Sequence, residues 1–262
     1  MTTSIPESAR DDRAAVDKAI SLLVAFGDQA STGVGVSELA RRTQLSKSTA
    51  FRVLAMLERN GVVERVGTGY RLGARLHQLG HTVYSPERER VRDLLLPFLT
   101  DLYDTTRHTV HLAALHGTDV VYLAKLYGHR TVPAPSRIGG RLPAHCTAVG
   151  KVLLAYHSHT ATQVLTAPQR AITPHTIIAP SRLTGELTTI RHSGVAHDNQ
   201  ESRLGLSCIA APIFNGRGRA VAALSVAGPH GHLDARRLET PLRQICASAS
   251  NALGRAQLPR TA

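Results

Sequence analysis

Apolar residues near the start of the chain recur at the i, i+3, i+4, i+7 spacing that places one apolar stripe on a helix. This spacing predicts a first helix over residues 16–26, with four residues facing inward: Val16, Ala19, Ile20 and Leu23. A short second helix is predicted from its N-cap, Ser37, to Arg42. A third helix is predicted over residues 47–59, where Ser46 is the cap and the inward-facing residues are Ala50, Val53, Leu54 and Leu57.

Residues 62–72 alternate around a glycine-rich tip, which predicts a β-hairpin. Three short helices followed by a hairpin are typical of a winged helix-turn-helix, whose third helix enters the major groove of DNA. The alternative interpretation of the same pattern is a small helical bundle with a solvated basic face.

The winged-helix prediction places several polar and basic residues against DNA. Those expected near base edges are Ser48, Thr49 and Arg52. Those expected mainly at phosphates are Arg41, Arg42, Lys47, Arg65 and Arg71, and Ser46 is grouped with them as a DNA-facing cap. From Arg41 to Arg75 the chain has eight Lys or Arg and only two acidic residues, which favours a polyanionic partner.

The rest of the chain mixes helical and strand patterns. A linker helix is predicted within residues 74–86, and Pro86 begins a further helix whose apolar stripe is Val91, Leu94, Leu95, Phe98 and Leu102. Strand pairs are predicted at 109–115 with 119–126 and at 207–214 with 220–227, before a closing helix over 233–253. Strands and helices without regular βαβ alternation predict an α+β domain with an antiparallel sheet.

A helix is predicted over residues 148–156 with Thr147 as its cap, and its first turn is a candidate binding site. Its first amides, at Ala148, Val149 and Gly150, have no partner within the helix and carry the positive end of its dipole. The sequence therefore predicts a receptor for the carboxylate of a small organic acid.

Composition sets the class of protein and the division of the chain. The 262 residues suit two domains, and no apolar run approaches the roughly 18 residues of a membrane-spanning helix. The net charge is +12, and three cysteines without a CxxC pair fit a reducing cytoplasm. We expect a leader (1–15), a winged helix-turn-helix (16–73), a linker (74–86), an effector domain (87–256) and a tail (257–262), with no membrane contact and no cofactor.

Eight segments in order resemble IclR-type one-component regulators of bacterial transcription. They are VSELARRT (36–43), LSKSTAFRVL (45–54), YRLG (70–73), TVHL (109–112), VVYL (120–123), LPAHCTAVGK (142–151), GLSCIAAP (205–212) and LSVAGP (224–229). The resemblance spans about residues 17–253. It implies a homodimer, often a dimer of dimers on an operator in double-stranded DNA, and a GAF-like C-terminal domain that holds a small effector.

The resemblance also implies which residues contact the effector. They are Leu142, Ala148, Val149, Asp198, Leu206, Cys208, Ser225 and Ala227. Several relatives have serine in place of Ala227, and a glutamate in place of Gln200 before Glu201. The missing hydroxyl makes the pocket more apolar, which favours a larger or aromatic acid over a small keto acid.

Two other kinds of protein are compatible with parts of the sequence. His145 beside Cys146, with Cys208 and His111 elsewhere, allows a cysteine-dependent hydrolase or a zinc site, although the spacing is diagnostic of neither. Cysteine is most often a small buried hydrophobic residue, and no phosphate loop, HExxH or GxSxG motif occurs. A DNA-bound architectural protein with a vestigial sensor is the second alternative.

Overall fold

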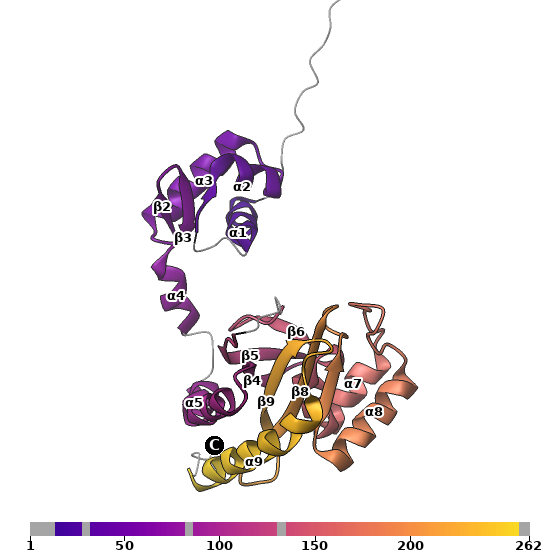
Figure 1. Ribbon diagram of the computed structural model, residues 1–262. Coiled ribbons are helices and arrows are strands. Elements are labelled where there is room, and N and C mark those ends of the chain that lie inside the picture. Colours follow the sequence, from indigo (N-terminus) through magenta and orange to yellow (C-terminus); the bar gives the residue numbers. More distant parts are fainter. Residues whose placement is uncertain (1–13, 28–31, 82–85, 130–134, 257–262) are drawn as a thin grey trace, which may run out of the picture. The chain divides into compact units, whose positions relative to one another are not determined.

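The computed structural model describes residues 14–27, 32–81, 86–129 and 135–256, and the chain divides into two compact units, 1–85 and 86–262 (Figure 1). The expected leader up to residue 13 and the expected tail over 257–262 lie outside the described residues.

The first unit is a helix-turn-helix with a three-stranded sheet. Its elements are α1 (Ala15–Ala25), β1 (Val34–Gly35), α2 (Val36–Thr43), α3 (Lys47–Arg59), β2 (Val63–Val66), β3 (Gly69–Leu72) and α4 (Ala74–His81). The antiparallel sheet has the order β1-β3-β2, so the predicted hairpin is β2-β3. Leu22, Phe26, Leu39 and Leu54 are fully buried in its core.

Two details of the predicted helices are wrong. Val16 and Ile20 are 70% and 55% exposed, and α1 instead turns Leu22 toward the core, because its apolar residues occupy more than one face. Ser37 lies inside the first turn of α2, whose N-cap is Gly35. Strand β1 pairs with β3 just before α2 and thereby sets where that helix begins.

The second unit is a six-stranded antiparallel sheet between helices, as the predicted α+β class requires. Its helices are α5 (Pro86–Thr106), α6 (Ala148–Ala155), α7 (Ser158–Thr166), α8 (Pro180–Ser193) and α9 (Ala235–Arg255), with the 3-10 turn η2 (Ala144–Cys146). Its strands are β4 (Thr109–His116), β5 (Asp119–Leu126), β6 (Arg141–Pro143), β7 (Ala196–Asn199), β8 (Leu206–Phe214) and β9 (Ala220–Pro229). Their order is β6-β5-β4-β9-β8-β7.

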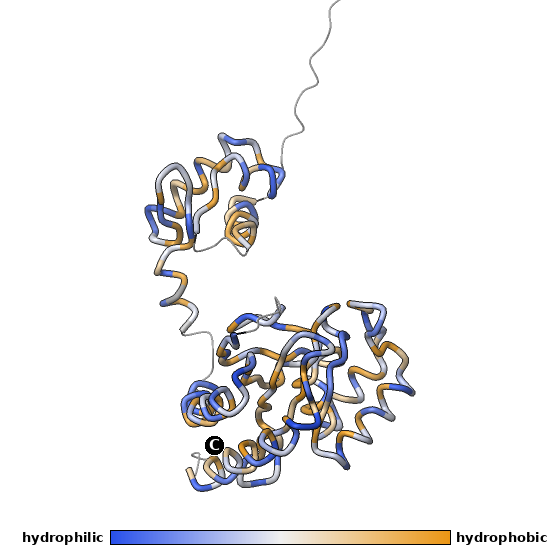
Figure 2. Tube along the Cα trace, viewed as in Figure 1, coloured by the Kyte–Doolittle hydropathy of each residue, from blue (hydrophilic) through white to orange (hydrophobic). Residues whose placement is uncertain are grey.

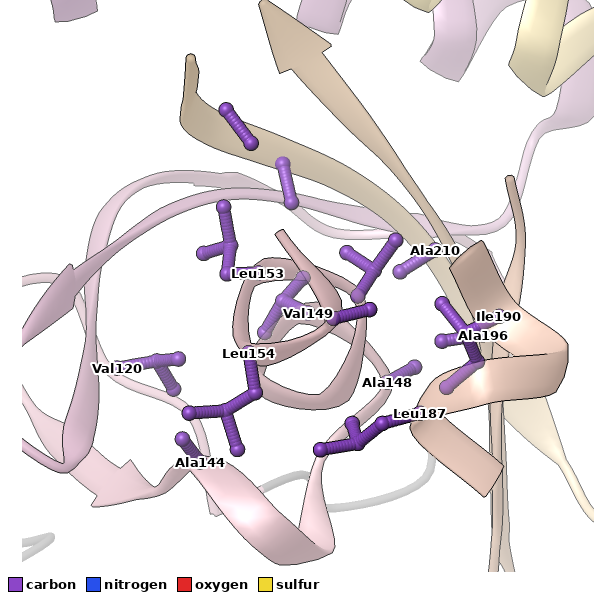
Figure 3. Close-up of a cluster of buried hydrophobic side chains, with 14 of the residues drawn as sticks. Val120, Ala144, Ala148, Val149, Leu153, Leu154, Leu187, Ile190, Ala196 and Ala210 are labelled. Atoms are coloured by element: carbon purple, nitrogen blue, oxygen red, sulfur yellow. The ribbon is translucent and has the colours of Figure 1, made fainter. Parts of the chain in front are cut away.

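Helices cover both faces of this sheet. Alternate residues of a strand point to opposite faces, so Ala210 of β8 packs with α6 while its neighbour Ala211 lies beside Cys246 of α9. Helices α5 and α9 lie on one face, and α6, α7 and α8 gather on the other (Figure 1). In Figure 3, Val149 and Leu153 of α6 lie among apolar side chains of the sheet and of α8.

The sequence predicted some of these elements incompletely. The buried stripe of α5 is Val91, Leu95, Leu99 and Leu102, whereas Leu94 is 37% exposed. The prediction did not include α7, α8, β6 or β7. Apolar positions recur along each element without forming one long apolar stretch (Figure 2), and no helix of the described residues is long and apolar enough to cross a membrane.

Candidate DNA-reading surface and effector pocket

The start of α3 is fixed by Ser46. Its hydroxyl accepts a hydrogen bond from the Thr49 amide at 3.2 Å and donates one to Thr49 Oγ1 at 2.8 Å. Ser46 therefore shapes the helix terminus, as a capping serine does. Lys47, Ser48 and Arg52 lie exposed beside this terminus, as a residue that touches DNA must.

Two of the predicted phosphate contacts, Arg41 and Arg42, form ion pairs with Glu38 that were not predicted from the sequence. Glu38 accepts hydrogen bonds from Arg41 at 2.7 and 2.9 Å and from Arg42 at 2.7 Å. These bonds lower the pKa of the Glu38 carboxyl to about 2, so it stays ionised. Arg42 also donates to the Ala25 carbonyl, which ties α2 to the end of α1. The i, i+3 and i, i+4 spacing of Glu38, Arg41 and Arg42 on one helix is the sequence signal that could have predicted these ion pairs.

The β2-β3 hairpin contains a similar ion pair between an arginine and a glutamate. Arg71 of β3 donates to Glu64 Oε2 of β2 at 2.7 and 3.0 Å, and the hydrogen bonds lower the pKa of the Glu64 carboxyl. Glu64 Oε1 accepts from the Ala74 amide at the start of α4. Arg65 places its guanidinium carbon 6.0 Å from the Tyr70 ring centre. The hairpin thus presents two arginines whose positions are set by neighbouring side chains.

The second unit contains a small pocket against the N-terminus of α6. Seven of the eight predicted effector residues line it: Leu142, Ala148, Val149, Asp198, Leu206, Cys208 and Ser225. Ala227 is outside the lining, although its register partner Cys208 is part of it. The lining includes six residues that the prediction missed as effector contacts: His111, Tyr122, Pro135, Ser136, Thr147 and Ser202. The pairing of β4 with β9 brings His111 opposite Ser225, a juxtaposition that the sequence alone does not specify.

The N-terminus of α6 has the geometry expected of an anion receptor. Thr147 Oγ1 accepts a hydrogen bond from the Gly150 amide at 3.0 Å, and the Thr147 carbonyl oxygen accepts one from the Lys151 amide. Within the described part of the chain, the amides of Ala148 and Val149 have no hydrogen-bond acceptor, and both residues line the pocket. Free amides at a helix N-terminus favour a carboxylate.

Asp198 uses its carboxylate to shape the loop at the pocket wall. Oδ1 accepts from the Glu201 and Ser202 amides at 2.7 and 3.3 Å, and Oδ2 accepts from Ser202 Oγ. Burial raises the pKa of the Asp198 carboxyl, while the three hydrogen bonds oppose that rise. Asp198 is 1% exposed, so its role in the geometry is to hold residues 198–202 in place.

A buried ion pair supports α6 from behind the pocket. Lys151, which is 1% exposed, donates to Glu201 Oε1 at 2.5 Å and to Glu186 Oε1 of α8 at 2.9 Å. Burial raises the pKa of the Glu201 carboxyl, and the charge of Lys151 opposes that rise. Glu201 Oε2 is buried without a hydrogen-bond partner among the described residues. Lys151 therefore links α6, α8 and the loop that Asp198 shapes.

The pKa values of the cysteine thiols are shifted in the direction opposite to that of a nucleophilic cysteine. Burial raises the pKa of the Cys146 thiol to about 12 and that of Cys208 well above its usual value. A cysteine hydrolase requires a lowered thiol pKa. No group of three or more His, Cys, Asp or Glu side chains within the described ranges is placed to hold a metal ion.

Known proteins resemble the chain over both units. The model described as "IclR helix-turn-helix domain" matches residues 15–67, and that described as "Bacterial transcriptional regulator IclR C-terminal" matches residues 85–253. The HTH-type transcriptional regulator XynR of Escherichia coli (strain K12) is 33% identical over 246 residues, which are 91% of this chain and 96% of that protein. The HTH-type transcriptional regulator KdgR of Dickeya chrysanthemi is 34% identical over 84% of this chain and 72% of its own.

Solved structures agree with these matches. The IclR of Thermotoga maritima has a TM-score of 0.75 and 31% identity, and the match covers 91% of this chain and 98% of that one. An IclR homolog from Microbacterium hydrocarbonoxydans, crystallised with 4-hydroxybenzoate, also has a TM-score of 0.75, with 28% identity and coverage of 93% and 100%.

Proposed function

Because this chain belongs to the IclR family of bacterial DNA-binding transcription regulators with a C-terminal effector domain, we propose that a small organic acid in the α6 pocket modulates its binding to an operator. The assignment of an acid depends on the amides of Ala148 and Val149, which have no acceptor among the described residues and belong to two residues that line the pocket. The Microbacterium homolog holds 4-hydroxybenzoate, which supports an aromatic acid as one member of that class.

We further propose that the protein acts in the cytoplasm as a homodimer or a dimer of dimers on a palindromic operator. A face of α1 formed by Val16, Ile20 and Val24 is 55–73% exposed, and an apolar face of this kind favours contact with another protein surface. A solution mass of two or four chains would support this part of the proposal, and a monomeric mass in the presence of operator DNA would contradict it.

The DNA-reading roles are tested by two arginine substitutions. Arg52→Ala is expected to relax base preference at one operator position, at a cost of about 1–3 kcal/mol on the preferred sequence. Arg71→Ala is expected to weaken binding to every sequence equally and to lower the salt-dependence slope by about one. Arg219→Ala, which removes an exposed charge from the second unit, is the matched control and should change neither property. Equal losses on all sequences for Arg52→Ala and Arg71→Ala would contradict the division of roles.

The effector is tested by titrating operator binding of the full chain with glyoxylate, pyruvate, benzoate and 4-hydroxybenzoate. We expect at least one acid to change the operator affinity, and the affinity of the same acid to differ by the same factor between the operator-bound and the operator-free chain, because coupling between two ligands is reciprocal. A response to glyoxylate or pyruvate alone would overturn the preference for an aromatic acid. Operator binding that ignores every acid would favour the architectural protein, and hydrolysis of an ester that is lost on Cys146→Ser or Cys208→Ser would favour the hydrolase.

A further inference from the structure

A continuous series of hydrogen bonds runs from a half-buried lysine to the pocket hydroxyl of Ser225. Lys125 Nζ lies 2.9 Å from the Ser136 carbonyl oxygen and 3.1 Å from Ser136 Oγ. Ser136 Oγ lies 2.8 Å from His111 Nε2, and His111 Nδ1 lies 3.2 Å from Ser225 Oγ. Ser136, His111 and Ser225 are each 3% exposed. We call these four residues the Lys125–Ser225 series.

The chemistry of the groups gives this series a direction, beginning at Lys125. A carbonyl oxygen only accepts hydrogen bonds, so Lys125 donates to Ser136, and an ammonium group has no acceptor to offer Ser136 Oγ in return. Lys125 also lies 4.4 Å from the centre of the Tyr127 ring, which stabilises a cation. Ser136 Oγ therefore accepts from Lys125 and has its own proton free to donate to His111 Nε2.

The direction continues through the imidazole of His111. Burial and the charge of Lys125 lower the pKa of His111 to about 3, so the ring is neutral and carries one N–H. Ser136 Oγ, to which Lys125 donates, lies beside Nε2, so the positive charge of Lys125 disfavours a proton on Nε2 and favours the tautomer whose proton is on Nδ1. Nδ1 then donates to Ser225 Oγ, which leaves the Ser225 proton without an acceptor among the described residues.

We propose that Lys125, Ser136 and His111 are positioning residues that orient the Ser225 hydroxyl as a hydrogen-bond donor into the effector pocket. The pocket lining then has donors from two elements, the Ser225 hydroxyl of β9 and the amides of Ala148 and Val149 in α6. Its ligand is an organic acid that presents a second acceptor oxygen in addition to its carboxylate. The statement about the ligand rests on the proposed effector function, whereas the orientation of the series does not.

The orientation is tested in the full chain without DNA or ligand. Nitrogen-15 labelling of histidine and long-range proton-nitrogen correlation spectra distinguish the two neutral tautomers, and His111→Gln identifies the His111 signals. We expect a protonated Nδ1 and an unprotonated Nε2. In Lys125→Met the two nitrogen signals should move toward each other's positions, because the cation no longer disfavours a proton on Nε2. Lys125→Arg and the distant control Lys47→Met should keep the wild-type signals.

A protonated Nε2 in the unmodified chain, or signals that Lys125→Met leaves unchanged, would overturn the proposed orientation. The ligand statement is tested by calorimetry with two pairs of acids, pyruvate with propionate and 4-hydroxybenzoate with benzoate. The acid with the second oxygen should bind more tightly in at least one pair, and Ser225→Ala should abolish the difference. Equal affinities within both pairs would overturn the ligand statement, and no binding of any acid would count against the proposed effector class while leaving the tautomer result intact.

Discussion

Gly150→Ala is expected to destabilise the second unit by about 3 kcal/mol, the upper end of the usual cost of overpacking. A Cβ on residue 150 would lie 2.2 Å from the Ala144 carbonyl oxygen and 2.4 Å from Ala144 Cα. Both atoms belong to the backbone of η2, so no side-chain rotation relieves the clash. The start of α6 must move away from η2, and the amides of Ala148 and Val149 move with it.

Urea denaturation of the full chain measures the loss of stability, and acid titration of operator binding measures the effect on the pocket. We expect the variant to bind operator without an acid response, because the DNA-reading residues belong to the other compact unit. Gly185→Ala in α8 is the matched control, since nothing lies within 4 Å of its added Cβ. That substitution should stabilise the helix by about 0.5–1 kcal/mol, the difference in helix propensity between glycine and alanine. Equal stability of the two variants would contradict the close approach of α6 to η2.

Lys151→Met is expected to cost about 3–5 kcal/mol near neutral pH, because it leaves a buried carboxylate without its partner. Lys151 donates to Glu201 and Glu186, and Glu201 is 4% exposed. Burial already raises the pKa of Glu201 above its usual value, and loss of the nearby cation raises it further. A raised folded-state pKa means that protonation favours the folded chain, so the loss should be smaller at pH 5.5 than at pH 7.5.

Denaturation at these two pH values tests both the size of the loss and its direction. Lys151→Met with Glu201→Gln should recover part of the stability, since the amide removes the unpaired charge. Lys47→Met is the control for loss of an exposed lysine and should change stability by less than about 0.5 kcal/mol. A loss for Lys151→Met that is independent of pH and of Glu201→Gln would show that the ion pair does not carry the effect.

The periodicity of the sequence predicted most of the elements near the two proposed sites. Helix α3 begins after Ser46 and α6 begins after Thr147, as predicted, because a hydroxyl that caps a helix acts on amides three residues away. The same locality explains the errors. The choice between Val16 and Leu22 as the buried residue of α1 depends on what packs against that helix, and the cap of α2 depends on a strand pairing with residues 69 and 70.

By itself the sequence determined the classes of the two units, the polar face of α3 and the capped terminus of α6, since each follows from residues within a few positions of one another. Only the tertiary structure decided which side chains meet across the sheet. His111 faces Ser225 from 114 positions away, and Lys151 reaches Glu201 from 50 positions away. Such pairs depend on strand register and helix docking, which bring together residues that no local pattern relates.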